Sequence, residues 1–220
     1  MASFLRRNGL SLALLSMFLA SQIGLSLVGF AHYNDEQKNH DQPTVTLVEY
    51  LTSGSYLEVT MENWESEFLQ MFAYVLLTVF LYQQGSAESK DPDQSEPVDR
   101  DPRLSMHKPD APWPVRRGGL ILKVYENSLS LALFALFLIA FVLHGVGGTL
   151  EYNLDQLAHG DETVTTLQYF GSSQFWYESL QNWQSEFLSI AVMVLLSIHL
   201  RQRGSPESKP VDSPHSETGA

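Results

Sequence analysis

The chain contains no cysteine among its 220 residues. This absence excludes a disulfide framework, thiolate metal sites and cysteine nucleophiles. Hydrolase nucleophile elbows, phosphate-binding loops, dinucleotide-binding loops and zinc-protease motifs are also missing, so the sequence predicts no catalytic residue and no cofactor. Formal charge is absent from two apolar runs of 21 residues, Leu10–Phe30 and Ser128–Gly148. At about 1.5 Å per helical residue, each run is roughly 31 Å long and matches a bilayer core of about 30 Å.

Two shorter apolar runs follow, Phe68–Tyr82 with 15 residues and Phe187–Leu200 with 14. Each is below the usual threshold of about 18 residues for a membrane span. Extension back to Trp64 or Trp183 gives enough length, with the indole ring at headgroup depth. The sequence therefore predicts four spans, at about 10–30, 64–82, 128–148 and 183–200.

The N-terminal run has a second interpretation. Arg6 and Arg7 precede it, and Gly29-Phe30-Ala31 resembles a signal-peptide cleavage site. However, a signal core is typically about 7–15 residues long, which is shorter than this run. We therefore expect a retained membrane anchor.

The two long runs belong to an internal repeat. Residues 8–90 (the first copy) align with residues 127–209 (the second copy) at a constant offset of 119 without a gap, and 34 of the 83 aligned positions are identical. Two spans per copy make both copies enter the membrane from the same side, as parallel repeats. The expected fold is an all-α, polytopic membrane protein with four transmembrane helices and partly helical outer loops. Its membrane units are residues 8–90 and 120–209.

The distribution of charge predicts the orientation. Of the 13 Lys and Arg, only Lys38 lies in a loop that joins the two spans of a copy. The positive-inside rule therefore places both termini and the segment between the copies in the cytoplasm. The outer loops, residues 31–67 and 149–186, carry eight acids against one base and six acids against none, a net charge of −13, whereas the whole chain carries −12. The negative excess thus belongs to the outer face.

The polar segments 91–119 and 210–220 are predicted to be a disordered cytoplasmic linker and tail, because they contain too few apolar residues to offset the entropy of ordering. Just before them, Gly85 and Gly204 suit helix stops, and both copies continue Ser-x-Glu-Ser-Lys. We interpret this motif as a solvated membrane exit, with docking or modification as the alternative.

Each outer loop ends in a helical pattern. Leu57, Met61, Trp64 and Phe68 follow a period of 3.6 residues, and the second copy has the same stripe, so helices should begin near residues 55 and 174. Ser55 and Glu58 suggest a capping box for the first of these helices.

The most similar part of the copies is N-W-x-S-E-F-L. Tryptophan suits the outer headgroup belt, and the simplest interpretation is an aromatic anchor. The alternative is a polar site for a cation or an amine around the pseudo-twofold axis. The residues of this candidate site are Asn63, Trp64, Ser66, Glu67, Asn182, Trp183, Ser185 and Glu186.

The histidines give no metal-binding pattern. His40 and His159 align, but each is the only histidine of its loop, and neither has a ligand at a typical spacing. His144 and His199 have no counterpart in the other copy. No metal site is predicted.

The fragments N-G-L-S-L, Y-L-T-S-G, E-N-W-E-S-E-F-L-Q-M and G-S-A-E-S-K-D-P resemble a family of bacterial membrane proteins of unknown function. The resemblance covers nearly the whole chain except the linker and the extreme tail. It implies a multi-pass protein of the bacterial cytoplasmic (inner) membrane, and it supplies no substrate. The second copy departs from the pattern, with Gln181 and Gln184 in place of Glu62 and Glu65.

We expect a scaffold or interaction protein, not an enzyme. Its partners would be the lipid bilayer and other membrane proteins or further copies of itself, with no nucleic acid. The alternatives are a small transporter or channel with an acidic outer vestibule, and an outward-facing sensor of divalent ions. No charged residue lies deep in a span, which disfavours transport.

Overall fold

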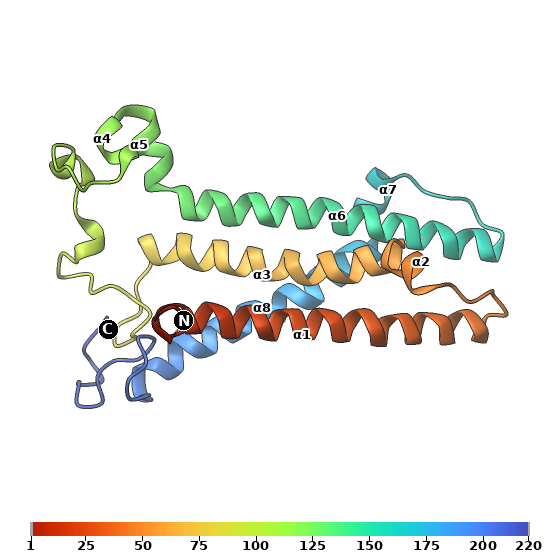
Figure 1. The fold of residues 1–220 in the computed structure, drawn as a ribbon, viewed down its shortest axis with the longest axis horizontal. Coiled ribbons are helices and arrows are strands. Elements are labelled where there is room, and N and C mark those ends of the chain that lie inside the picture. The colour runs from red at the N-terminus through yellow and green to blue at the C-terminus, as the bar shows by residue number, and fades with distance from the viewer. Residues whose placement is uncertain (1, 220) are drawn as a thin grey trace. The chain divides into compact units, whose positions relative to one another are not determined.

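The computed structural model describes residues 2–219, and every regular element in that range is helical. Four helices are long: α1 (Ala2–Asn39), α3 (Gly54–Phe80), α6 (Ser128–His159) and α8 (Ser173–His199). The short α-helices are α2 (Leu47–Leu51), α4 (Trp113–Arg117), α5 (Gly119–Glu126) and α7 (Thr166–Phe170), and the 3-10 helices are η1 (Pro97–Asp99) and η2 (Pro102–Ser105). Figure 1 traces this order along the chain. The expected all-α fold is confirmed.

The predicted spans 10–30 and 128–148 lie within α1 and α6. Among the described residues, these two helices are long and apolar enough to cross a membrane, by length and composition. The predicted spans 64–82 and 183–200 fall within α3 and α8, apart from their last one or two residues, and so are helical as well.

The helix starts agree with the periodicity, but the predicted capping box is wrong. α3 begins at Gly54 and α8 at Ser173, each one residue before the predicted position. Each helix is capped by the serine that precedes it. The Ser53 hydroxyl accepts a hydrogen bond from the Tyr56 amide at 3.2 Å, and the Ser172 hydroxyl accepts one from the Phe175 amide at 3.2 Å. Capping boxes occur instead at the starts of the short helices α2 and α7.

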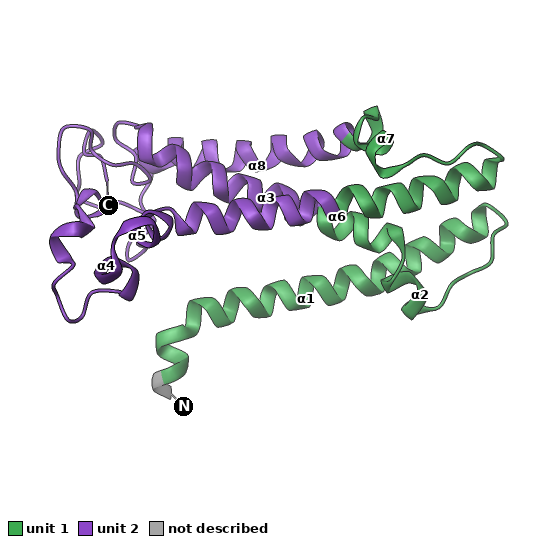
Figure 2. Ribbon diagram, turned by 90° about the horizontal axis from the view of Figure 1, so that it is seen from above, with its two compact units in different colours: residues 1–61, 143–175 green, residues 62–142, 176–220 purple. Residues whose placement is uncertain are grey.

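The chain forms two compact units, coloured in Figure 2, and each unit combines segments of both copies. Unit 1 is residues 1–61 and 143–175; unit 2 is residues 62–142 and 176–220. In unit 1, the side-chain oxygen of Asn34 accepts a hydrogen bond from the Val45 amide at 2.7 Å. The side-chain oxygen of Asn153 accepts the equivalent bond from the Val164 amide at 2.7 Å. The loop after α1 and the loop after α6 are thus fixed to the preceding helix by equivalent hydrogen bonds.

Unit 2 contains the exits from α3 and α8, where the repeated motif forms the same turn twice. The Gln83 amide donates to the Ser89 hydroxyl at 2.9 Å, and the Gln202 amide donates to the Ser208 hydroxyl at 2.9 Å. The preceding glycines, Gly85 and Gly204, have φ values of 83° and 84°, which favour glycine. The Ser-x-Glu-Ser-Lys motif is therefore a specific hydrogen-bonded turn.

In the structure, the linker, for which we predict disorder, contains η1, η2 and α4, and the described part of the tail contains turns. The Lys90 ammonium lies 2.6 Å from the Asp99 carboxylate. Lys209 is 1% exposed and donates to the carbonyl oxygens of Gly85 at 2.5 Å and Glu217 at 2.6 Å. Burial of this ammonium lowers the pKa of Lys209.

Candidate functional site

The predicted motif residues lie on α3 and α8 within unit 2, where side chains from the two copies meet. The indole nitrogen of Trp183 donates to the Glu65 carboxylate at 2.8 Å, and the Asn182 amide donates to the Glu62 carboxylate. One turn further along α3, the Gln70 amide nitrogen donates to the Glu186 carbonyl at 2.8 Å and to the Ser189 hydroxyl at 2.8 Å. We call this set the polar belt: Glu62, Glu65, Gln70, Asn182, Trp183, Glu186 and Ser189.

Gln70 and Ser189 are equivalent positions of the two copies, separated by the repeat offset of 119. Two equivalent residues touch each other where a twofold axis passes between them. Two further belt contacts join positions that are only one residue apart in the alignment, Asn182 with Glu62 and Trp183 with Glu65. The belt is therefore the place where the two copies meet most symmetrically within unit 2.

The belt uses only part of the predicted site. Asn182 and Trp183 form inter-helix bonds, and Glu186 contributes its backbone carbonyl. The hydroxyls of Ser66 and Ser185 instead donate to carbonyls of their own helices, those of Asn63 and Asn182, each at 2.8 Å. The Trp64 ring packs against Phe68, with ring centroids 6.5 Å apart, and Glu67 is exposed. The structure thus does not gather all eight residues around one site.

Glu62, Glu65 and Gln70 were missed because the two copies differ at these positions. Glu65 is fully buried, and its counterpart is Gln184. A comparison of the copies selects identical residues, whereas the hydrogen bonds between the copies also use positions where the residue types differ. The replacement of two acids by glutamines was the signal that could have identified the partners.

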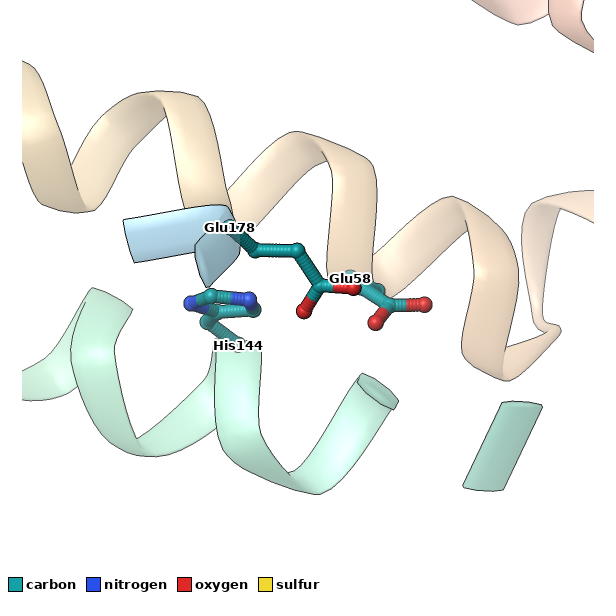
Figure 3. A group of neighbouring side chains, drawn as sticks. All are labelled: Glu58, His144 and Glu178. Carbon is teal, nitrogen blue, oxygen red and sulfur yellow. The ribbon is translucent and has the colours of Figure 1, made fainter. Parts of the chain in front are cut away.

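A second cluster lies in unit 1, and sequence reasoning did not predict it. Figure 3 shows the Glu58 carboxylate of α3 and the His144 ring of α6, whose ligand atoms lie within 4.8 Å of each other. Glu178, also drawn there, belongs to unit 2. The Tyr169 hydroxyl donates to Glu58 at 3.0 Å, and the His144 ring, which is 0% exposed, lies 4.8 Å from that of Phe175 between centroids.

Tyrosines complete the packing of unit 1. Tyr50 and Tyr169 occupy equivalent positions, and both are at least 97% buried. The Tyr50 ring packs against the rings of Tyr33 at 5.5 Å and Tyr56 at 5.4 Å between centroids. Burial, followed by the proximity of Tyr56, raises the pKa of Tyr50. The Tyr50 hydroxyl therefore stays protonated at neutral pH.

The two clusters differ in what they offer chemically. In the polar belt, the carboxylates accept hydrogen bonds from fixed donors on another helix, which ties helices together. In unit 1, an imidazole and a carboxylate lie near each other, and both are side chains that bind divalent metal ions.

Comparison with known proteins identifies a family but no activity. No curated protein and no solved structure matches the chain. The model of a domain of unknown function, DUF6766, matches residues 1–220. Because that match spans the whole sequence, the chain belongs to the DUF6766 family.

Proposed function

We propose that the protein is a four-span protein of the bacterial cytoplasmic membrane, built from two tandem copies, and that it acts there as a scaffold or interaction protein and not as an enzyme. Both termini lie in the cytoplasm and the acidic loops lie outside. The proposal extends from two helices that are long and apolar enough to cross a bilayer to four, because α3 and α8 carry the shorter apolar run of each copy.

The observation that carries the proposal is the inversion of burial. Large apolar side chains are exposed along the long helices: Leu10 is 75% exposed, Val28 is 70% and Leu129 is 61%. Among the described residues, buried polar side chains outnumber buried apolar ones, and they include the fully buried Glu65 and His144. A water-soluble protein buries its large apolar residues and exposes its charges. Exposed apolar helix surfaces around a polar, hydrogen-bonded interior suit a lipid environment.

An interaction role is supported by the difference between the two apolar helices. None of the most apolar 18-residue window of α1 is buried, compared with 17% of the window of α6. An apolar surface of this extent is available both to lipid and to another transmembrane helix. The belt side chains, in contrast, bond to one another. This arrangement favours a structural role over an open polar path for ions.

Site-specific photocrosslinking in native membranes tests the interaction role. A photoreactive residue at Leu14 or Leu19, which are 56% and 57% exposed, should give discrete adducts with protein, either another chain or a second copy. The matched control is Ala140, which is 2% exposed and should give no intermolecular adduct. Adducts with lipid alone at both α1 positions would contradict the interaction role.

The alternative is a small channel or transporter, which the outer net charge of −13 would serve by concentrating cations. Cation flux through proteoliposomes that contain the purified protein separates the two functions. A scaffold should give the flux of empty liposomes. Selective flux that Glu65→Gln changes would establish the channel instead.

A further inference from the structure

His144 is set into unit 1 in a way that fixes the direction of its ring. The residue is 0% exposed, and the Phe175 ring covers it at 4.8 Å between centroids. A histidine that only fills space in an apolar environment is normally accompanied by other apolar groups. Here, a carboxylate on another helix lies near its ring nitrogens.

That carboxylate belongs to Glu58, which is itself held in place. The Tyr169 hydroxyl donates to Glu58 Oε1 at 3.0 Å. The ligand atoms of Glu58 and His144 lie within 4.8 Å of each other. Two ligands that each lie about 2.0–2.2 Å from one metal ion are at most about 4.4 Å apart. A small rotation of the Glu58 side chain is therefore enough for both to hold the same ion.

The close approach of α3 to α6 depends on glycines. A Cβ atom added at Gly147 would lie 2.6 Å from the Glu58 amide nitrogen, and one added at Gly148 would lie 2.6 Å from Glu58 Oε1. Gly148 is one turn beyond His144 on α6. The absence of side chains at these positions thus makes room for the Glu58 backbone and carboxylate beside the histidine.

Among the described residues, the arrangement occurs once, although the sequence is repeated. The positions equivalent to Glu58 and His144 are Tyr177 and Leu25, neither of which offers a carboxylate or an imidazole. A packing solution that both copies needed would be expected in both. The pair is therefore a specialised feature of one end of unit 1.

We propose that Glu58 and His144 bind a divalent first-row metal ion, with Zn²⁺ as the best fit. Nitrogen and carboxylate donors suit Zn²⁺, whereas Ca²⁺ requires six to eight oxygen ligands.

The test measures metal binding by the purified full-length chain, with any histidine tag removed. After incubation with Zn²⁺ and exhaustive dialysis, the wild type should retain about one ion per chain by mass spectrometry. His144→Gln and Glu58→Gln should each lower the affinity at least tenfold. His159→Ala and Glu162→Gln, which alter exposed residues of the second outer loop, are the matched controls and should bind like the wild type. A wild type without bound Zn²⁺ overturns the proposal.

Tyr169→Phe separates a metal site from a hydrogen bond that only supports packing. This variant keeps the buried ring and removes the hydroxyl that orients Glu58. Loss of a group that orients a ligand typically weakens metal binding by 10- to 100-fold. Substitution with Co²⁺ gives a visible absorption band that reports the ligands directly, and His144→Gln should change it. An unchanged band in a folded His144→Gln variant would contradict the assignment.

Discussion

At Trp183, the indole N–H makes a hydrogen bond that the ring of phenylalanine cannot make. The indole N–H donates to Glu65, a carboxylate that is 0% exposed. Hydrogen bonds to charged groups contribute more to stability than hydrogen bonds between neutral groups. Trp183 therefore joins two helices, a role that the residue type alone did not predict.

Trp183→Phe should destabilise the protein by about 1.5–3 kcal/mol, since Glu65 loses a fixed donor. Trp64→Phe is the matched control, because the position equivalent to Glu65 in the second copy is the uncharged Gln184. Unfolding of the purified protein in mixed micelles of rising SDS fraction measures both variants. Equal losses for the two substitutions would show that the tryptophans act only through their ring systems.

At the scale of helices, glycines of α6 allow α3 to pack closely against it. A Cβ at Gly147 would meet backbone atoms of Glu58 and Gly54, which cannot move without shifting a helix. At Gly24 of α1, a Cβ would meet nothing within 4 Å. The two glycines therefore make opposite predictions for the same substitution.

Gly147→Ala should cost about 1–3 kcal/mol through overpacking. Gly24→Ala should be neutral or stabilise by up to about 1 kcal/mol, because alanine favours the helix. The same SDS unfolding experiment compares the two variants. A Gly147→Ala variant as stable as the wild type would mean that α3 and α6 are not packed as described.

The short helices α2 and α7 differ at one capping residue. Glu49 completes the capping box of α2 and Gln168 that of α7. Hydrogen bonds from Thr46 lower the pKa of Glu49 below its ordinary 4.5. Its stabilising effect on the folded helix is therefore complete above pH 4.5 and is lost as the pH falls through the lowered folded value. Gln168 does not titrate.

Acidification should therefore loosen α2 before α7. Amide hydrogen exchange at Tyr50 and Tyr169 measures the opening of each helix directly. The Tyr50 amide donates to the Thr46 carbonyl at 3.0 Å, and the Tyr169 amide donates to the Thr165 carbonyl at 2.9 Å. After correction for intrinsic exchange, protection at Tyr50 should fall in acid while that at Tyr169 stays constant. Glu49→Gln should remove the difference, and a difference that persists in this variant would refute the explanation.

For the whole molecule, long-range periodicity made the main elements predictable. The apolar stripe that ends in Phe68 placed the start of α3 within one residue, since a helix of 27 residues repeats its pattern many times. Helices α2 and α7 have only five residues each and are too short for periodicity. Their Thr-x-x-Glu and Thr-x-x-Gln spacing was the available signal.

The site could be predicted less well, because its contacts depend on tertiary structure. Trp183 was a candidate, but its partner Glu65 lies 118 residues away and is not shared by the second copy. Glu58 and His144 lie 86 residues apart, so no local spacing marks them as a pair. Internal identity shows which positions solve the same problem twice, whereas both clusters depend on positions where the copies differ.

Transmembrane topology is the property of the whole molecule on which the account depends, and the chain suits a labelling test because it contains no cysteine. Single cysteines can be placed at exposed positions: Asn39 and Ala158 in the predicted outer loops, and Ser95 and Ser216 in the predicted cytoplasmic segments. Each variant is treated with a membrane-impermeant maleimide in intact spheroplasts and again after permeabilisation.

The account predicts that Asn39→Cys and Ala158→Cys react in intact spheroplasts, and that Ser95→Cys and Ser216→Cys react only after permeabilisation. Four spans and cytoplasmic termini require this pattern. Labelling of Ser95→Cys or Ser216→Cys in intact spheroplasts would contradict the proposed topology.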